Sequence, residues 1–268
     1  MKKHLIVIGL ISVVLSGCFS GCVGPEVTDY FNGEYPVDEQ TIVSVSNING
    51  QVEITGWAGD NVTVSAVKTS TLGEEELHNV NISVNQIGNH LEIETKYTGQ
   101  KFIQAGVDYS IKVPFNTTIG TIMTSNGGIQ ISNTKGDIIA SSSNGAIIME
   151  NVDGVVSATT SNGHIEILNT TGIRDIRTSN AAITAEVQSI PDDVSIETSN
   201  GAVTVYVNPL LNATLEMATS NAKVKLQEIT LNINLLEDTH VIGTLGMDGQ
   251  KIDIHTSNAN IYLNKLQT

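Results

Sequence analysis

The chain contains few aromatic residues, few prolines and almost no cysteine. Only 4% of its 268 residues are aromatic, whereas 40% are hydrophobic, so any core must be built from Ile, Val, Leu and Ala. Five prolines and 24 glycines are too few for a collagen-like or disordered chain. Both cysteines, Cys18 and Cys22, lie close to the N-terminus, so we expect no disulfide in the folded part.

Basic residues are scarce as well. There are 13 Lys and Arg residues against 28 Asp and Glu residues, which gives a net charge of −15. Lys and Arg form no cluster that could neutralise a phosphate backbone. We therefore expect no nucleic-acid partner.

The common catalytic and metal-binding motifs are absent from the sequence. Its six histidines share no motif or metal-ligand spacing, and there is no Gly-x-Ser-x-Gly, phosphate-binding glycine loop or HExxH. We expect no catalytic residue, no metal site and no cofactor. The enzyme alternative is polysaccharide cleavage, which needs two carboxylates held close together. Glu150 and Glu166 do not stand at matching repeat offsets, so this alternative is disfavoured.

What the chain does have is a repeated tripeptide, Ser-Asn-Gly or Ser-Asn-Ala, which occurs seven times. The spacings between its asparagines are 18, 18, 18, 20, 21 and 37 residues, and 37 equals one coil of 18 plus one of 19. A fixed period in this range indicates a stacked repeat architecture, which displays a long surface. The asparagines are Asn126, Asn144, Asn162, Asn180, Asn200, Asn221 and Asn258.

Each repeat has the apolar pattern of two short strands. The positions four residues before, three after and five after each asparagine are apolar in every repeat, as in Ile122, Ile129 and Ile131. A spacing of two residues places side chains on one side of a β-strand. We therefore predict an all-β, single-stranded parallel β-solenoid with about 18 residues per coil. Strands of neighbouring coils would lie about 4.8 Å apart.

Stacking of the coils would bring equivalent side chains into columns. We expect the asparagines to form a ladder of hydrogen-bonded amides at a tight, buried corner. A second column would hold Thr124, Ser142, Thr160, Thr178, Thr198, Thr219 and Thr256. The columns would act as a structural brace, with a ligand-binding stripe as the alternative. At the opposite corner, glycines such as Gly136 would supply positive φ angles.

The repeat pattern also indicates the domain boundaries. We predict a β-rich N-terminal cap over 39–120, which includes a coil-like unit around Asn49 and a loop at 74–76, and repeats over 121–268. Ile233, Leu235 and Ile242 fit a degenerate coil around Thr239 within the 37-residue gap.

The N-terminus has the pattern of an export signal. Lys2 and Lys3 precede an apolar stretch over 5–15, and residues 15–18 (Leu-Ser-Gly-Cys) resemble the lipobox of prokaryotic lipoproteins. We predict a signal peptide over 1–17, lipid attachment at Cys18 and a flexible tether over 18–38. Cys22 is a second candidate acceptor, and an ordinary signal peptide is the alternative.

Residues 39–268 resemble the family called "putative adhesin", a β-strand-repeat domain of bacterial and archaeal envelope proteins. The resemblance rests on Asn-Gly-x-Val-x-Ile-x-Gly at 49–56, on Val113-Pro114, and on the serial Thr-Ser-Asn-Gly repeats. It implies a right-handed β-helix, an adhesin-like surface role and no general catalytic motif. The chain departs from the pattern where Ala follows Asn180, Asn221 and Asn258.

These features favour a non-enzymatic, lipid-anchored protein on the extracytoplasmic cell surface, which presents a rigid face for binding. Its ligand would be an envelope glycan, a surface-layer component or a membrane protein. The alternative is an envelope-stress sensor that acts through a membrane partner. Outward polar side chains would form the binding face, namely Gln130, Glu166, Thr184, Thr204 and Lys225.

Overall fold

The computed structural model describes residues 26–98 and 104–267. These residues form 21 β-strands and one short helix, so the predicted all-β class is confirmed. The predicted signal peptide and the lipid-attachment residue Cys18 lie outside the described residues. Among the described residues, no helix is long and apolar enough to cross a membrane.

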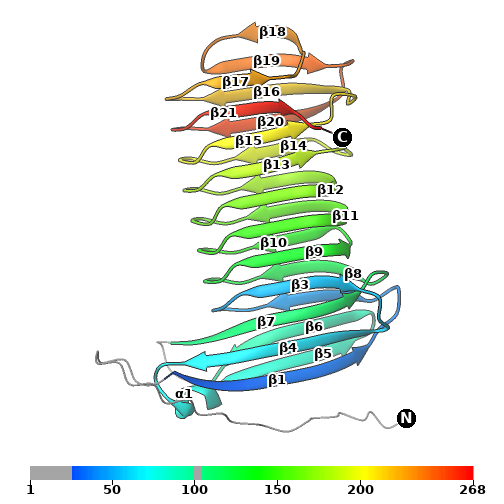
Figure 1. Cartoon of the computed structure of the whole chain (residues 1–268), viewed down its shortest axis with the longest axis vertical. Helices are drawn as coiled ribbons and strands as arrows, with labels where there is room; N and C mark the ends of the chain where they lie inside the picture. The colour runs from blue at the N-terminus through cyan, green and yellow to red at the C-terminus, as the bar shows by residue number, and fades with distance from the viewer. Residues whose placement is uncertain (1–25, 99–103, 268) are drawn as a thin grey trace.

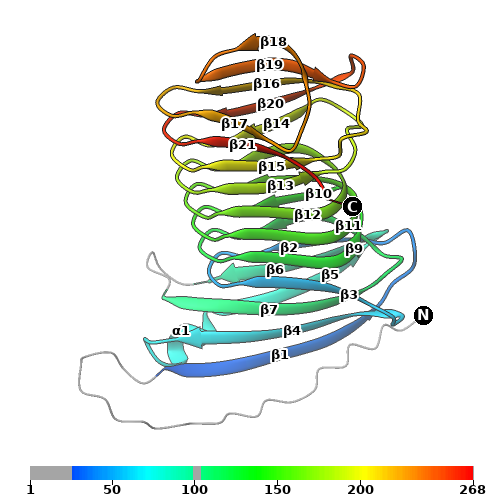
Figure 2. The ribbon, with the colours of Figure 1, turned by 45° about the horizontal axis from the view of Figure 1, so that its top comes forward.

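The strands form one hydrogen-bonded sheet that turns back on itself into two facing walls (Figures 1 and 2). In order of pairing, wall 1 contains β5 (Val80–Ile87), β6 (His90–Tyr97), β2 (Ile42–Ser46), β8 (Thr118–Met123), β10 (Ile138–Ser141), the second halves of β11 (Ile147–Thr159) and β12 (Ile165–Arg177), β14 (Val194–Glu197), β20 (Gln250–Thr256), β16 (Ala213–Thr219), β19 (His240–Leu245) and β18 (Asn232–Leu236). Wall 2 contains β1 (Val27–Pro36), β4 (Asn61–Ser70), β7 (Ala105–Pro114), β3 (Val52–Trp57), β9 (Ile129–Lys135), the first halves of β11 and β12, β13 (Ile183–Val187), β15 (Val203–Val207), β21 (Ile261–Lys265) and β17 (Val224–Gln227).

Parallel pairing in the middle of the stack follows the sequence repeat. Ile129 pairs with Ile147, Ile147 with Ile165, and Ile165 with Ile183, so successive partners are 18 residues apart. These four side chains are at most 1% exposed, because they point between the walls. Alternate burial along each short strand therefore builds a continuous aliphatic core.

The N-terminal end of the stack is closed by antiparallel strands and a helix. β4 pairs antiparallel with β1 and β7, and β5 pairs antiparallel with β6. The helix α1 (Glu74–His78) contacts β1, β4 and β5 and buries Leu77, so residues 74–76 are helical and not the expected loop. β2 and β3 already pair in parallel with β8 and β9, in agreement with the coil-like unit around Asn49.

The predicted tether is wrong over residues 27–36, which form the ten-residue strand β1. Val27, Phe31 and Tyr35 pack against the core, and the outward residues between them are Tyr30, Asn32 and Glu34. Asp29 and Gly33 share the inward side, which disguises the alternation in the sequence. Pairing with β4 along its whole length supplies the hydrogen bonds that order this segment.

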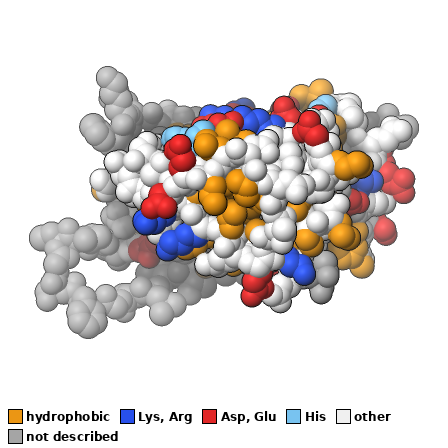
Figure 3. Space-filling view, turned by 90° about the horizontal axis from the view of Figure 1, so that it is seen from above, with side chains coloured by type: hydrophobic (Ala, Val, Ile, Leu, Met, Phe, Trp, Pro, Cys, Tyr) orange, Lys and Arg blue, Asp and Glu red, His pale blue; other side chains and the backbone are white. Residues whose placement is uncertain are grey.

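The C-terminal end is closed by an antiparallel hairpin where the sequence predicted a degenerate coil. β18 pairs antiparallel with β19, and β19 pairs antiparallel with β16. The turn between β18 and β19 is too short for a coil, because the Glu237 N–H already bonds the His240 carbonyl. β18 leaves Ile233 and Leu236 exposed, and apolar side chains gather in the middle of this end (Figure 3).

The last repeat in the sequence is not the last in space. β20 lies between β14 and β16, and β21 lies between β15 and β17. The red C-terminal strands in Figure 1 are accordingly inserted below the orange ones. The final two repeats are therefore stacked in an order that differs from their order in the sequence.

Candidate functional site

The repeated asparagines form one hydrogen-bonded column along a corner of the stack. Each side-chain Nδ2 donates to the Oδ1 of the asparagine below it, at 2.6–2.8 Å. The column begins at Asn49 and, owing to the inserted strands, places Asn258 between Asn200 and Asn221. All seven repeat asparagines are exposed, so the expected burial of this corner is wrong.

The adjacent column of Thr124, Ser142 and their equivalents is the buried one. Their side chains are at most 6% exposed, and each hydroxyl donates to a backbone carbonyl of the next coil at 2.9–3.2 Å. At Gly145 and Gly163 the backbone N–H also bonds the hydroxyl three residues earlier. These hydroxyls are therefore occupied within the corner and are not free to bind a ligand.

A second amide column runs along the opposite corner. Asn133, Asn151, Asn169 and Gln188 are linked by side-chain hydrogen bonds of 2.6–3.2 Å. The three asparagines adopt φ angles of 48–56°. Gly136 has a φ of 128°, so the expected positive φ is confirmed at this glycine. A hollow of about 280 Å³ lies beside this column, but its amides already bond to one another.

The outward side chains of wall 2 line up across the strands. Gln130 pairs in register with Ile148, Ile148 with Glu166, and Glu166 with Thr184. The column continues through Thr204 and Tyr262 to Lys225, whose ammonium lies 5.0 Å from the Tyr262 ring centre. All five outward residues named from the sequence thus lie in one column, together with three side chains that the sequence did not single out, Ile148, Tyr262 and Glu53.

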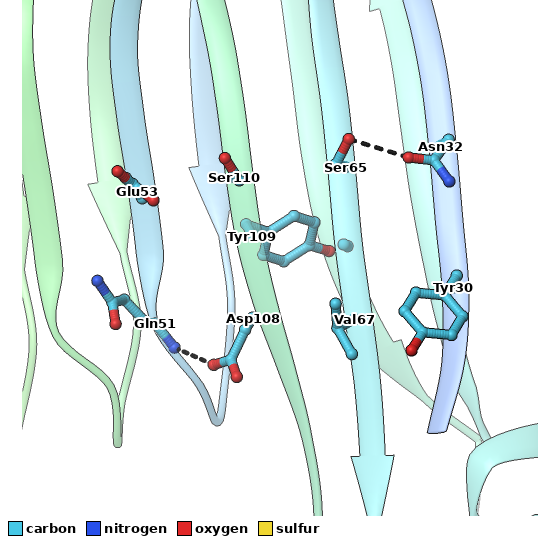
Figure 4. A pocket seen from close by; sticks show the side chains of 10 residues that line it. Tyr30, Asn32, Gln51, Glu53, Ser65, Val67, Asp108, Tyr109 and Ser110 are labelled. Carbon is cyan, nitrogen blue, oxygen red and sulfur yellow. Dashed lines mark hydrogen bonds between the residues drawn. The ribbon is translucent and has the colours of Figure 1, made fainter. Parts of the chain in front are cut away.

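At its lower end this column opens into a hollow of about 270 Å³, which we call the cap hollow. Two rows of outward side chains cross four strands here (Figure 4). One row holds Asn32, Ser65, Ser110 and Glu53. The other holds Tyr30, Val67, Asp108 and Gln51.

Hydrogen bonds hold part of the cap hollow in place. The Ser65 hydroxyl donates to Asn32 Oδ1 at 2.9 Å, and the Gln51 backbone N–H donates to Asp108 Oδ1 at 2.7 Å. Tyr30 remains 50% exposed and presents its ring beside Val67. The hollow therefore combines an apolar platform with amide, hydroxyl and carboxylate groups.

The second tyrosine of the cap hollow, Tyr109, is part of the core. Its side chain is 2% exposed, and its hydroxyl lies 2.7 Å from the Thr95 hydroxyl. Burial raises the pKa of Tyr109 to about 12, so the phenol stays protonated and takes no part in acid–base chemistry near neutral pH.

The charge of the cap hollow is negative. Glu53 and Asp108 are its ionisable carboxylates, and its lining includes no Lys or Arg. Lys112 lies two residues beyond Ser110 on the same side of β7, outside the hollow. Within the described residues, no three His, Cys, Asp or Glu side chains converge so as to hold a metal ion.

Sequence reasoning missed the cap hollow for a clear reason. Its residues come from β1, β4, β7, β3 and the turn before β3, most of which are distant in sequence. Tyr30 and Asn32 also fell within the predicted tether. The sequence carries a weak signal, because the aromatic residues Phe31 and Tyr35 alternate there with the polar residues Asn32 and Glu34.

No protein-family profile matches the chain, and no curated protein matches it. A structure of a "putative cell adhesion protein" from Clostridium sporogenes has 12% identity and a TM-score of 0.32, with 88% of this chain and 100% of the other covered. A "putative adhesin" from Bacteroides fragilis has 12% identity and a TM-score of 0.32, with 88% of this chain and 97% of the other covered.

A third structure, a "putative adhesin" from Parabacteroides merdae, has 11% identity and a TM-score of 0.36, with 89% of this chain and 96% of the other covered. The structural neighbours thus carry adhesin names at low sequence identity. Likeness at this level does not establish a shared fold or a shared ligand.

Proposed function

We propose that this chain is an exported, lipid-anchored cell-surface protein that binds sugar residues of a surface glycan through the cap hollow. In this proposal the rest of the described chain is a parallel β-solenoid of about 18 residues per coil. The solenoid holds the hollow rigidly and extends its binding face along wall 2. The protein acts by binding and not by catalysis.

The observation that carries the proposal is the mixed lining of the cap hollow. A sugar ring has an apolar face of C–H groups and a rim of hydroxyls. Tyr30 and Val67 offer a surface against which the apolar face can lie, and Asn32, Gln51 and Glu53 offer hydrogen-bonding groups for the rim. The hollow's volume of about 270 Å³ suits one ring of a longer glycan.

Charge narrows the class of sugar. Two carboxylates without a Lys or Arg in the lining would repel uronic acids, sialic acids and phosphorylated sugars. The same carboxylates accept hydrogen bonds from neutral hydroxyls and attract a protonated amino group. We therefore assign neutral sugars or amino sugars as the ligand class.

The binding test uses the purified full chain on an array of neutral, amino and acidic glycans, followed by calorimetry on the best binder. We expect neutral or amino glycans to be retained and acidic glycans to be rejected. Tyr30→Ala should weaken binding about 2- to 12-fold, because an aromatic contact contributes about 0.5–1.5 kcal/mol. Glu53→Gln should weaken binding of an amino sugar more than that of its neutral analogue.

Phe115→Ala is the matched control, because Phe115 is an exposed aromatic residue (55%) outside the cap hollow. It should leave binding unchanged. Retention of acidic glycans alone, or full binding by a folded Tyr30→Ala variant, would contradict the proposal. Labelling with a radioactive fatty acid tests the anchor separately, since Cys18→Ser should abolish incorporation.

A further inference from the structure

The inserted C-terminal strands occupy a slot between two parts of the fold that follow each other in the chain. β15 leads directly to β16, yet β20 separates β14 from β16, and β21 separates β15 from β17. We call residues 250–265 the inserted segment. The preceding coils leave a space one coil thick that only a later segment fills.

The asparagine column, the Thr/Ser column and the outward column of wall 2 all pass through the inserted segment. Ile252, Ile254, Ile261 and Leu263 are fully buried, and Lys251 Nζ lies 2.8 Å from Glu216 Oε2. The shared columns add bonds on both sides, from Asn258 to Asn200, Asn221 to Asn258, Thr256 to Gly201 and Thr219 to Ala259. The slot is therefore a specific binding site for the sequence of this segment.

A short exposed loop joins the inserted segment to β19. It comprises residues 246–249, all of them exposed, with Met247 72% exposed. Gly246 has a φ of 63°, and Gly249 ends the loop, so the loop has two residues with broad backbone freedom. The loop is held on one side only, where the Met247 N–H bonds Asn212 Oδ1 at 2.9 Å and the Thr214 hydroxyl bonds Asp248 Oδ1, and the opening of the loop breaks these two bonds.

We propose that the inserted segment exchanges between two copies of this chain, each copy filling the slot of the other. The contacts within the slot are identical whichever copy supplies residues 250–265, so exchange alters only the loop over 246–249. Intrachain filling dominates while the protein concentration is below the effective concentration of the tethered segment, which is of the order of millimolar for a short linker. Crowding of copies on a surface favours the exchanged pair.

The place of the slot in the fold is compatible with exchange between copies. The slot lies near the end of the stack opposite β1, and β1 is the described strand nearest the N-terminus (Figure 1). Exchange would therefore join copies near the ends opposite β1. This interaction is independent of the cap hollow and does not require a sugar ligand.

The test uses paired cysteine variants of the full chain in which Cys18 and Cys22 are replaced by serine. Ser195 on β14 and Asp253 on β20 are register partners on the outside of wall 1. Neighbouring strands lie about 4.8 Å apart, which is within the Cα separation of a disulfide. Chains with Ser195→Cys and chains with Asp253→Cys are unfolded together, refolded at about 2 mM, which exceeds the effective concentration of a short linker, and oxidised.

Exchange predicts a disulfide between the two variants and a doubled mass in solution. The matched control pairs Ser157→Cys with Asp253→Cys, because Ser157 lies two strands away from Ser195 in the same column and cannot reach residue 253. A chain that carries both Ser195→Cys and Asp253→Cys should close an internal disulfide at about 1 µM, which shows that the two positions can bond.

The proposal would be overturned if the double variant forms its internal disulfide but the mixture of single variants forms no more intermolecular disulfide than the control pair. A second measurement is deletion of Met247 and Asp248, which shortens the loop and hinders intrachain filling. The dimer fraction at equal concentration should rise about tenfold or more. A folded deletion variant that stays monomeric at about 2 mM would also overturn it.

Discussion

At the scale of single residues, the two columns at the Ser-Asn corner have different roles. The hydroxyl of each Thr or Ser is buried and joins two coils, whereas each asparagine amide bonds its neighbours at the surface. Water can replace the exposed amide bonds but cannot reach the buried hydroxyls. The buried column should therefore contribute more to the free energy of unfolding.

Thr160→Val tests this difference while conserving the shape of the side chain. It removes the bond from Thr160 Oγ1 to the Gly145 carbonyl (3.0 Å) and the bond from the Gly163 N–H to Thr160 Oγ1 (3.3 Å). We expect a loss of about 1–3 kcal/mol in urea unfolding. Asn162→Ala, in the exposed column of the same repeat, should lose less than about 1 kcal/mol. The reverse order would contradict the assignment of the brace to the hydroxyls.

Tyr109 predicts an alkaline limit to stability. Its pKa is raised by burial to about 12, whereas the unfolded phenol titrates near 10. The stabilising difference is fully present below pH 10 and is lost as the pH rises towards 12, because the unfolded chain then releases a proton that the folded chain retains. Two pKa units correspond to about 3 kcal/mol for Tyr109.

Unfolding by urea at pH 8, 10 and 11 checks this pH dependence. Tyr109→Phe should be less stable than the wild type at pH 8, since Thr95 loses its partner, but should lose less stability between pH 10 and 11. Burial also raises the pKa of Tyr97 to about 12. The Tyr109→Phe variant should therefore still lose some stability at high pH. An identical pH dependence in both proteins would contradict this account.

At the scale of elements, the two ends of the stack differ from its middle. Parallel pairing leaves strand edges at the ends of the stack. Antiparallel strands follow the parallel ones in both walls at the N-terminal end and in wall 1 at the C-terminal end, whereas wall 2 ends there in the parallel strand β17. At the N-terminal end the helix α1 also covers the core by inserting Leu77. This short helix is stabilised by its packing, since five residues are too few for a stable helix alone.

Leu77→Ala should therefore destabilise the N-terminal end. Leu77 is 5% exposed, and truncation of a buried leucine costs about 2–5 kcal/mol. Glu75→Ala on the exposed side of α1 is the control and should change stability by less than about 0.5 kcal/mol. Calorimetry measures both. Equal melting temperatures for Leu77→Ala and wild type would show that α1 does not close the core.

At the scale of the whole molecule, each strand of the stack pairs only with the strands directly beside it, so we expect stability to vary along the stack. β11 and β12 have partners on both sides, whereas β1, β5 and β18 lie at edges. The inserted segment joins the C-terminal strands to the rest of the stack. Its loss would leave β16 and β17 without a partner strand on the side of β14 and β15.

Hydrogen exchange measured by mass spectrometry should show this gradient. We expect amides of β11 and β12 to exchange several orders of magnitude more slowly than those of β1, β5 and β18, because the edge strands open locally. The inserted segment should be as protected as β14 despite its late place in the chain. Rapid exchange throughout β20 and β21 would contradict the observed pairing.

The sequence by itself determined the all-β class, the inward aliphatic positions and the 18-residue offset between partners. These follow from local alternation and from the repeat, and each repeat carries its own signal. The sequence also placed Gln130, Glu166, Thr184, Thr204 and Lys225 on one face. Burial of the corner was not readable in this way, because the same Ser-Asn motif fits a buried or an exposed amide column.

Only the tertiary structure decided which coil neighbours which. The contact of β20 with β14 and β16 depends on how the hairpin β18–β19 ends the stack, and no local pattern records it. The cap hollow depends likewise on the antiparallel pairing of β1 with β4 and of β4 with β7. Pairing between segments distant in the chain is a global choice of lowest free energy, whereas alternation along a strand is local, and only the local part can be read from the order of residues.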